Sequence, residues 1–407
     1  EQQRKEVHEA ILRHRKVAGM QRTAESVLRT VFGDAYARDF NVAFWDGTVV
    51  PASREPRFTF RVNSPGALRA AFKPPVDLNV GRAVAAGLLD VDGDIEAAVD
   101  ELFQLVQRPS PATMFCLSWL LRRLPRAPLP QLREARLSGK RHSLARDRAA
   151  IGFHYDQPVE FYASFLDRDL VYSCAYFDDG VESLEEAQRA KIDHTLRKLR
   201  LRRGERLLDI GCGWGALVVR AAREFGAHVL GVTLSETQVR EGARRIAQAG
   251  LSGSARIELR DYREVSGAFD KIVSIGMFEH VGRDKLPEYF GTAFRLLEPG
   301  GLFLNHGIAL HGSQQRNGRA SGFMGRFIFP DGELETVSDA LQFAERAGFE
   351  VRDVENLREH YARTLRHWVR NLETNRDAAI AAAGEQSYRA WRLYMAGSAQ
   401  GFRTGRI

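Results

Sequence analysis

The segment LLDIGCGWGA, residues 207–216, holds residue types that could bind a ligand carrying a nucleoside. Gly211, Gly213 and Gly215 alternate directly after an apolar run, and Asp209 stands just before them. Glycine permits a tight turn and a close approach of the backbone to a ligand. A helix that begins after the turn would point its first N–H groups at the same ligand. The segment therefore predicts a ligand site where a strand turns into a helix.

Two ligand classes fit these glycines. Read as G-x-G-x-x-A, with Ala216 last, the segment matches a dinucleotide fingerprint. That fingerprint needs an acidic residue about 20 positions later to bind a ribose, and Thr233 or Leu234 stands there instead. Read as D-x-G-x-G-x-G, the segment fits S-adenosylmethionine, which has no phosphate and whose ammonium group suits the carboxylate of Asp209. The sequence favours S-adenosylmethionine as the cofactor.

The pattern around the turn predicts the elements that position it. Short apolar runs alternate with helical segments from about residue 200 onward. The runs are ERLLDI at 205–210, HVLGVTL at 228–234, ARIELRDY at 255–262, FDKIVSIGMF at 269–278 and GGLFLNHGI at 300–308. Such alternation is typical of a parallel sheet that binds its ligand at the carboxyl ends of the strands. We therefore expect an α/β, Rossmann-like domain over residues 151–407, with helical lid elements towards its C-terminal end.

The first part of the chain has a different pattern. Residues 1–30 look helical, and Asp46-Gly47 is a hairpin signal inside the alternating strand segment 41–50. Further segments are RFTFRV at 57–62, SPGALRAAF at 64–72, and GLLDVDGDIEAAVDELFQL at 87–105, which reads as strand, turn and helix. We expect a small α+β domain over residues 1–110 and a basic linker rich in Pro and Arg over residues 111–150.

The net charge of +7 is concentrated in that linker. Between Arg122 and Arg148 the chain has nine Lys or Arg residues against two acids, Glu134 and Asp147. For an isolated run of this kind, a solvated linker is the default interpretation. The alternative is a patch attracted to phosphate, on nucleic acid or on an anionic membrane surface. Charge alone does not choose between the two.

Other bulk features narrow the class of protein. No apolar stretch approaches the roughly 20 residues that a membrane span needs, and TMFCLSWLL at 113–121 is better explained as a buried helix end. The first residues lack the apolar core of a secretory signal. Cys116, Cys174 and Cys212 are odd in number and widely spaced, which argues against a disulfide framework or a metal site and favours a reducing cytoplasm.

Five motifs, in this order and spacing, resemble the cyclopropane fatty acid synthase family. That family includes the mycolic acid cyclopropane synthases and related lipid C-methyltransferases. The motifs are LVYSCAYF at 170–177, LDIGCGWG at 208–215, GVTLSETQ at 231–238, SIGMFEHVG at 274–282 and HYARTLRHW at 360–368. The resemblance covers roughly residues 150–405, and the N-terminal part resembles, more loosely, the lipid-carrier-like domain of longer bacterial members. The chain lacks an initiator Met and stops at Ile407, where relatives usually continue into a final strand, so trimming at both ends is an open question.

The resemblance implies a reaction. Members transfer the methyl group of S-adenosylmethionine to the cis double bond of an unsaturated fatty acyl chain in a phospholipid. The resulting carbocation loses a proton to a bound bicarbonate and closes to a cyclopropane. Loss of a proton from a neighbouring carbon would give a methylene or methyl-branched product instead. A small-molecule N- or O-methyltransferase remains the rival from another enzyme class, because it would share the glycine motif.

The resemblance also assigns residues to the site. The bicarbonate would be held by Cys174, Glu279, His306, Ile308 and Tyr361. Together with the glycine segment, the motifs assign S-adenosylmethionine to Tyr172, Ser173, Asp209, Gly211, Gly213, Gly215, Thr233, Leu234, Gln238, Asp261, Tyr262 and Ile275. No metal is implied.

Several of these side chains also have a purely structural interpretation. Cys174 lies in an aromatic stretch, where a cysteine is normally a small buried side chain. Glu279 and His280 could cap the next helix. Tyr361 stands at helical spacing from Leu365 and would more often belong to a core.

A lipid substrate makes an anionic membrane the expected partner of the basic stretch, at about 1 kcal/mol per well-placed basic residue. We therefore expect a cytoplasmic enzyme that associates peripherally with the inner face of the membrane. Relatives with the extra N-terminal domain suggest a homodimer. Nucleic acid is not an expected partner, because MFEHVG at 277–282 lacks the Asn/Asp-Pro-Pro-aromatic motif of many base methyltransferases.

Overall fold

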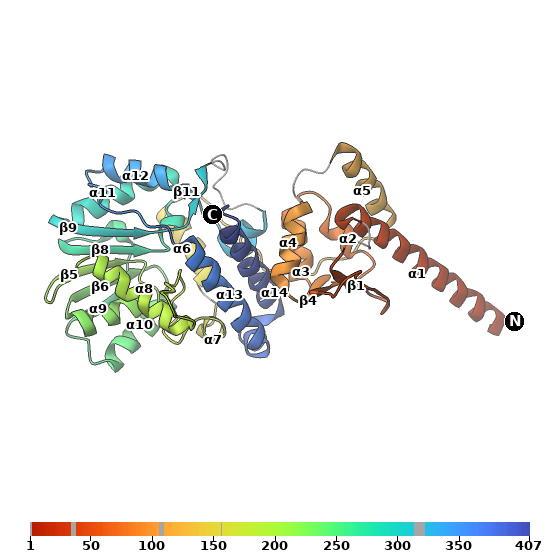
Figure 1. Cartoon of the computed structure of the whole chain (residues 1–407), viewed down its shortest axis with the longest axis horizontal. Helices are drawn as coiled ribbons and strands as arrows, with labels where there is room; N and C mark the ends of the chain where they lie inside the picture. Colours follow the sequence, from red (N-terminus) through yellow and green to blue (C-terminus); the bar gives the residue numbers. More distant parts are fainter. Residues whose placement is uncertain (1, 34–37, 106–109, 156, 313–321) are drawn as a thin grey trace. The chain divides into compact units, whose positions relative to one another are not determined.

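The computed structural model describes residues 2–33, 38–105, 110–155, 157–312 and 322–407. By their internal contacts, the residues divide into two compact units, whose elements are labelled in Figure 1. The N-terminal unit comprises Glu1–Arg133 and Glu385–Gln400, and the C-terminal unit comprises Glu134–Gly384 and Gly401–Ile407. A segment from near the end of the chain therefore belongs to the N-terminal unit.

The N-terminal unit contains a four-stranded sheet in the order β2-β1-β3-β4. Its strands are β1 (Phe40–Phe44), β2 (Val49–Val50), β3 (Phe58–Val62) and β4 (Leu89–Gly93). The helices are α1 (Gln2–Phe32), α2 (Ala67–Ala71), α3 (Val76–Ala85), α4 (Ile95–Leu105) and α5 (Pro111–Arg123). β1 pairs in parallel with β3 and antiparallel with β2, while β3 pairs antiparallel with β4. The mixture of strands and helices is the one expected from the sequence.

The predicted hairpin at Asp46-Gly47 is confirmed. The N–H of Phe44 donates to the carbonyl of Thr48 at 2.8 Å, and Gly47 has a φ of +87°, which glycine adopts without strain. In β1 and β3 every second residue is buried, as in strands with one face on a core.

The segment Glu385–Gln400 supplies part of the core of the N-terminal unit. It lies within α14 (Arg376–Arg403), which is interrupted at Gly384, where φ is +81°. Trp391 and Tyr394 are buried. The guanidinium of Arg392 donates to the carbonyls of Val91 at 2.9 Å and Gly93 at 3.2 Å. The segment is thus tied to β4 by both apolar and polar contacts.

The linker expected at residues 111–150 is corrected by the structure, because two helices lie within it. Helix α5 belongs to the N-terminal unit, and α6 (Leu144–Tyr155) belongs to the C-terminal unit. The side chain of Ser110 accepts a hydrogen bond from the N–H of Thr113 and caps α5, and Pro111 occupies its first turn. A proline is favoured at that position because its missing N–H would have no helical partner there. Proline therefore marked a helix start, which the sequence analysis counted as linker.

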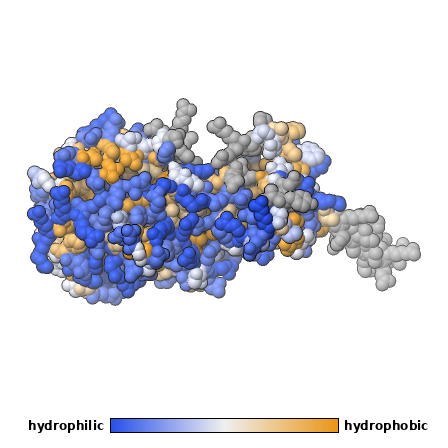
Figure 2. Space-filling model, in the orientation of Figure 1, coloured by the Kyte–Doolittle hydropathy of each residue, from blue (hydrophilic) through white to orange (hydrophobic). Residues whose placement is uncertain are grey.

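Helix α5 also differs from the buried helix end that we expected at 113–121. Leu117, Leu120 and Leu121 are buried, but Phe115 is 77% exposed and Trp119 is 47% exposed. Figure 2 shows apolar surface over this helix. Helix α5 thus presents an aromatic face outside the core.

The C-terminal unit is built on a parallel five-stranded sheet in the order β7-β6-β5-β8-β9. Its strands are β5 (Arg206–Ile210), β6 (His228–Thr233), β7 (Ala255–Leu259), β8 (Phe269–Ile275) and β9 (Leu297–His306). All five strands fall on the predicted apolar runs, so the Rossmann-like prediction is confirmed. The strand order reverses direction between β5 and β8, and a crevice forms at the carboxyl ends of strands at such a point.

Helices cover both faces of this sheet (Figure 1). The helices of this unit are α6, α7 (Val159–Ala163), α8 (Leu184–Lys198), α9 (Ala216–Phe225), α10 (Glu236–Gln248), α11 (Leu286–Leu296), α12 (Val337–Arg346), α13 (Arg358–Thr374) and the outer parts of α14. Helices α8, α9 and α10 pack on one face of the sheet and α11 on the other. Short elements complete the unit: β10 (Ala309–Leu310), β11 (Glu335–Thr336), the 3-10 turns Tyr262–Glu264, Phe278–His280 and Arg283–Lys285, and a π-helix at Met324–Ile328. Leu207 packs in the cluster with α8, α9 and α10, whereas its neighbour Leu208 packs in the cluster with α11. Adjacent residues of a buried parallel strand face opposite layers.

The third glycine of the turn is fixed by packing. Gly215 precedes α9 with a φ of +85°. A Cβ atom at Gly215 would lie 2.7 Å from Cδ1 of Ile257 on β7. Glycine is required there on two counts, the left-handed backbone and the close approach of β7.

We expect Gly215→Ala to destabilise the protein by about 3 kcal/mol, the sum of about 1 kcal/mol for the left-handed backbone and about 2 kcal/mol for the overlap with Ile257. Gly204→Ala is the matched control, because Gly204 has a φ of +80° and nothing within 4 Å of its Cβ position. Gly204→Ala should lower the free energy of unfolding only by the contribution of the left-handed backbone, about 1 kcal/mol. Urea unfolding of both variants measures the difference, and equal losses would contradict a packing role for Gly215.

Candidate active site

One pocket opens at the carboxyl ends of β5, β6 and β8, at the point where the strand order reverses. Of the twelve residues predicted for the cofactor, eleven line it: Tyr172, Ser173, Asp209, Gly211, Gly213, Thr233, Leu234, Gln238, Asp261, Tyr262 and Ile275. Gly215 does not line the pocket, since it serves the packing of α9 against β7. The position of Gly213 contrasts with it, because a Cβ atom there would have no neighbour within 4 Å.

The carboxylate of Asp209 is buried in this pocket. The residue is 3% exposed, and among the described residues no donor reaches its side chain by a hydrogen bond. Burial raises the pKa of Asp209 to about 7, and the positive charge of Lys191 opposes this rise. A buried carboxylate without a donor fits the ammonium group of an amino-acid ligand.

Lys191 is a pocket residue that the sequence analysis missed. It is 4% exposed, lines the pocket, and donates from Nζ to Oγ of Ser173 at 3.0 Å. Burial lowers the pKa of Lys191 to about 8. The signal was present in the sequence, because Lys191 stands on the buried stripe of α8 with Ala187 and Ile192. A lysine at such a position is buried only where it has a partner or a function.

The end of β6 carries the residues that replace the usual acid. Oγ1 of Thr233 donates to Oε1 of Gln238 at 2.5 Å. Ser235 caps α10 by accepting from the N–H of Gln238. The motif T-L-S-x-x-Q therefore folds Gln238 back over the strand end, with its side chain at the pocket.

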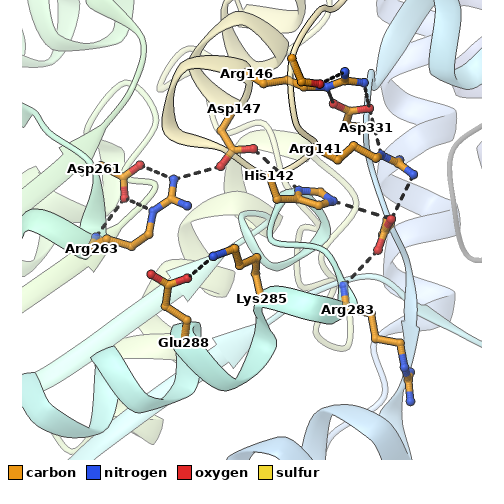
Figure 3. Close-up of polar contacts among 12 residues, drawn as sticks. Arg141, His142, Arg146, Asp147, Asp261, Arg263, Arg283, Lys285, Glu288 and Asp331 are labelled. Atoms are coloured by element: carbon orange, nitrogen blue, oxygen red, sulfur yellow. Dashed lines mark hydrogen bonds and ion pairs between the residues drawn. The ribbon is translucent and has the colours of Figure 1, made fainter.

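A chain of ion pairs runs from Asp261 along the wall of the pocket (Figure 3). Arg263 donates to both carboxylate oxygens of Asp261, at 2.8 and 2.6 Å, and to Asp147 on α6 at 2.9 Å. Asp147 lies 3.7 Å from Nδ1 of His142, and Glu333 lies 3.7 Å from Nε2 of the same ring. The carboxylate of Asp261 is thus engaged by Arg263, and its negative charge is compensated.

The same chain continues into the basic stretch. Arg146 donates to Asp331 at 2.5 and 2.9 Å, and Arg141 lies 3.1 Å from Asp331 and 3.3 Å from Glu333. These two arginines are internal partners of acidic residues and are not part of a free basic patch. The remaining basic residues of the stretch are exposed: Arg122, Arg123, Arg126, Arg133, Arg136, Lys140 and Arg148.

Aromatic rings wall the pocket near Tyr172. The ring of Tyr172 lies 5.1 Å from Trp368 and 5.8 Å from Tyr162. Tyr162 in turn lies 4.7 Å from Trp214, a residue of the glycine turn. Trp368 and Tyr162 are fully buried. This side of the site is rich in aromatic rings.

Glu279 and Ile308, two of the five residues predicted for the anion, contact each other. The N–H of Ile308 donates to Oε1 of Glu279 at 2.7 Å. Oε2 of Glu279 is buried and has no hydrogen-bond partner among the described residues. Burial raises the pKa of Glu279 to about 7. An orphaned buried carboxyl oxygen fits a small hydrogen-bonding anion such as bicarbonate.

His306 ends β9 beside this pair. It is paired with Ile275 of β8, and its carbonyl accepts from the N–H of Gly276 at 2.9 Å. Burial lowers the pKa of His306 to about 4. The imidazole is therefore neutral at physiological pH.

Cys174 and Tyr361 meet at the start of α13. The thiol of Cys174 donates to the carbonyl of Leu357 at 3.7 Å, and the N–H of Tyr361 donates to the same carbonyl at 2.9 Å. Burial raises the pKa of Cys174 to about 12, so the thiol stays protonated. Glu279 and Ile308 are thus in contact, His306 stands two residues before Ile308, and Cys174 and Tyr361 share the carbonyl of Leu357. None of the five lines the pocket described above, and a common anion for all five stays a prediction.

Comparisons with known proteins agree on one family. The family model for mycolic acid cyclopropane synthetase matches residues 142–407. A probable fatty acid methyltransferase of Pseudomonas putida is 40% identical over 370 residues, which are 89% of this chain and 88% of that protein. Cyclopropane mycolic acid synthase 1 of Mycobacterium tuberculosis is 39% identical over 64% of this chain and 94% of its own length. The crystal structure of the mycolic acid cyclopropane synthase CmaA1, complexed with SAH and CTAB, is 37% identical and has a TM-score of 0.61 over 64% of this chain and 94% of that chain.

The raised pKa of Glu279 predicts how stability changes with pH. Its pKa is about 7 when folded and near 4.5 when unfolded. The folded state keeps a proton that the unfolded state loses, so the wild type loses stability as pH rises from about 4.5 to 7. In bicarbonate-free buffer, Glu279→Gln should therefore stabilise the protein by at most about 3 kcal/mol at pH 8 relative to its effect at pH 4.5.

Urea unfolding at the two pH values measures this effect. Glu182→Gln is the control for the loss of one negative charge, because the side chain of Glu182 is 89% exposed. An effect of Glu279→Gln that does not change with pH would contradict the burial of an ionisable carboxyl at this position.

Proposed function

Because the chain belongs to the mycolic acid cyclopropane synthetase family and is an S-adenosylmethionine-dependent methyltransferase, we propose that it methylates the cis double bond of an unsaturated fatty acyl chain in a phospholipid and forms a cyclopropane. The names of the relatives, a fatty acid methyltransferase and a cyclopropane mycolic acid synthase, support a lipid substrate. So does CmaA1, which was crystallised with CTAB.

The pocket at the carboxyl ends of the strands would hold S-adenosylmethionine. The complex of CmaA1 with SAH supports this, and so does the buried carboxylate of Asp209, which has no donor of its own. Gly211 and Gly213 leave the backbone open to the ligand, with φ values of +79° and +54°. Thr233 and Gln238 lie on the side where a ribose would be bound.

The proposed reaction depends on positioning and on the exclusion of water. An alkene is a weak nucleophile, so the methyl group must be held in line with it. The π electrons of the alkene form the new C–C bond, the sulfur keeps the electron pair of the broken S–C bond, and a carbocation remains. The ring of Tyr172 lines the pocket and would face the positive charge, and the buried rings of Tyr162 and Trp368 behind it would exclude water.

The observation that carries the proposal is the carboxyl group of Glu279. One oxygen is held by the N–H of Ile308, and the other is buried without a partner. We infer that Glu279, His306 and Ile308, with Cys174 and Tyr361, hold a bicarbonate ion. That ion supplies a base which takes a proton from the added methyl group, and the electrons of the C–H bond close the ring. The raised pKa of Glu279 would let this carboxyl keep its proton and donate a hydrogen bond to the anion, which stays available as the base.

The membrane is the proposed partner, and the structure directs the proposal to α5. Phe115 and Trp119 are exposed one helical turn apart, and the guanidinium carbon of Arg123 lies 3.4 Å from the ring centre of Trp119. Arg122 and Arg126 are exposed beside them. Aromatic side chains next to basic ones bind the interface of anionic bilayers. No helix among the described residues is long and apolar enough to cross a membrane. The cytoplasmic location and the homodimer stay predictions.

The product can be identified directly. Incubation with S-adenosylmethionine and vesicles of monounsaturated phospholipid should add one CH₂ to the acyl chains, measured by mass spectrometry after release. NMR then separates a ring from a methylene or methyl branch. Intact acyl chains, together with methylation of a polar small molecule, would contradict the lipid reaction.

The roles of the anion site are tested by Glu279→Gln and Tyr361→Phe. Both variants should lower turnover by about 100-fold or more, the usual effect of losing a general acid or base. Affinity for S-adenosylhomocysteine, measured by calorimetry, should stay nearly constant because neither residue lines the cofactor pocket. Equal losses in turnover and affinity would contradict these roles.

Membrane binding through α5 is tested by co-sedimentation with vesicles that contain anionic phospholipid. The double variant Phe115→Ser, Trp119→Ser should bind them at least about tenfold more weakly, and salt should weaken the wild type as well. Val354→Ser is the matched control, because Val354 is 55% exposed on the C-terminal unit. Vesicle binding that changes neither with the α5 substitutions nor with lipid charge or salt would contradict membrane docking through the exposed aromatic face of α5.

A further inference from the structure

Lys191 has hydrogen-bonding capacity that the protein does not use. Its ammonium group can donate three hydrogen bonds. Among the described residues it donates one, to Oγ of Ser173 at 3.0 Å. The residue is 4% exposed and lines the cofactor pocket. Its remaining donors therefore face the pocket without a partner in the described part of the chain.

The acids near Lys191 do not pair with it directly. Asp167 and Asp209 act on it through their charges, and neither has an oxygen within 4.0 Å of Nζ. The carboxylate of Asp167 already accepts from the N–H of Val171 at 2.7 Å and from that of Asp169 at 3.2 Å. A buried ammonium group without direct pairing is costly to the free protein.

We propose that Lys191 binds the α-carboxylate of the methionyl group of S-adenosylmethionine, while Asp209 takes the ammonium group of the same amino acid. This inference rests on the proposed function. The methionyl tail is a zwitterion, and the pocket presents one buried negative group, Asp209, and one buried positive group, Lys191, neither of which has a directly paired group of opposite charge among the residues that the structure describes. The ammonium group of the tail would pair with Asp209 and its carboxylate with Lys191, so that the two positive and two negative charges would cancel.

Ser173 connects Lys191 to the ligand. Its oxygen accepts the hydrogen bond from Lys191, so its own hydroxyl proton remains available for the carboxylate. Ser173 lines the pocket beside Tyr172. The side-chain amide of Gln188 donates to the carbonyl of Ser173 at 2.8 Å and fixes this part of the chain. Helix α8 therefore sets the position of the tail through Lys191 and Gln188.

The test compares two ligands that differ by the carboxylate alone. S-adenosylhomocysteine carries the whole amino-acid tail, and its decarboxylated analogue keeps the ammonium group only. By calorimetry at pH 7, the wild type should bind S-adenosylhomocysteine at least about tenfold more tightly than the analogue. Lys191→Met should lose at least about tenfold of the affinity for S-adenosylhomocysteine and bind the analogue within about twofold of the wild type.

Lys198→Met is the matched control on α8, because Lys198 pairs with Asp353 and Glu355 away from the pocket. It should leave both affinities unchanged. Circular dichroism reports whether each variant is folded, and Lys191→Gln replaces Lys191→Met if the latter is not.

Equal losses for both ligands, or no loss for either, would overturn the role of Lys191. Failure of the wild type to bind S-adenosylhomocysteine would instead overturn the proposed function, so the two failures are distinguishable.

Discussion

The site depends on charged groups that the fold removes from water without giving them full partners. Asp209, Lys191 and Glu279 are buried at the carboxyl edge of one sheet, and burial shifts the pKa of each towards its neutral form. Such burial is unfavourable for the free protein, because no directly paired group of opposite charge among the described residues compensates for the lost hydration. A ligand of matching charge recovers this free energy when it binds. Selectivity for a zwitterion and for a small anion therefore follows from what the protein leaves unpaired.

The other charged groups around the pocket are paired with groups of opposite charge. Arg263 neutralises Asp261 and Asp147, and Arg146 does the same for Asp331. These pairs lie along the wall of the pocket and join α6 to the loop after β7 (Figure 3). Beneath them, Leu207 and Leu208 pack the sheet against helices on both faces. The acids of the rim thus have arginine partners, whereas Asp209 and Lys191 line the pocket without a directly paired opposite charge in the described ranges.

The fold of the C-terminal unit could be predicted because its signals are local. Each strand is a short apolar run, and the glycine turn marks where β5 ends. The pocket residues follow from that edge, together with the family motifs. Lys191 was missed although it stands on the buried stripe of α8, because that stripe does not show which pocket the helix faces. The pairing of Arg141 and Arg146 was missed for the same reason, since Asp331 lies almost 200 residues away in sequence. The start of helix α5 was missed because Pro111 was counted as a linker residue and not as a helix start, although a helix end was expected at 113–121.

The N-terminal unit takes a core segment, Glu385–Gln400, from almost the last residues of the chain. A ribosome that makes this protein releases β1 to β4 long before it releases Trp391 and Tyr394, which are buried in the mature unit. During synthesis, the N-terminal unit therefore lacks this core segment until the sheet of the C-terminal unit has been made. Proteolytic cutting near residue 133 would leave the N-terminal fragment without its segment Glu385–Gln400, which would stay on the other fragment. Although the contacts separate two compact units, the N-terminal unit cannot be completed before most of the C-terminal unit has been synthesised.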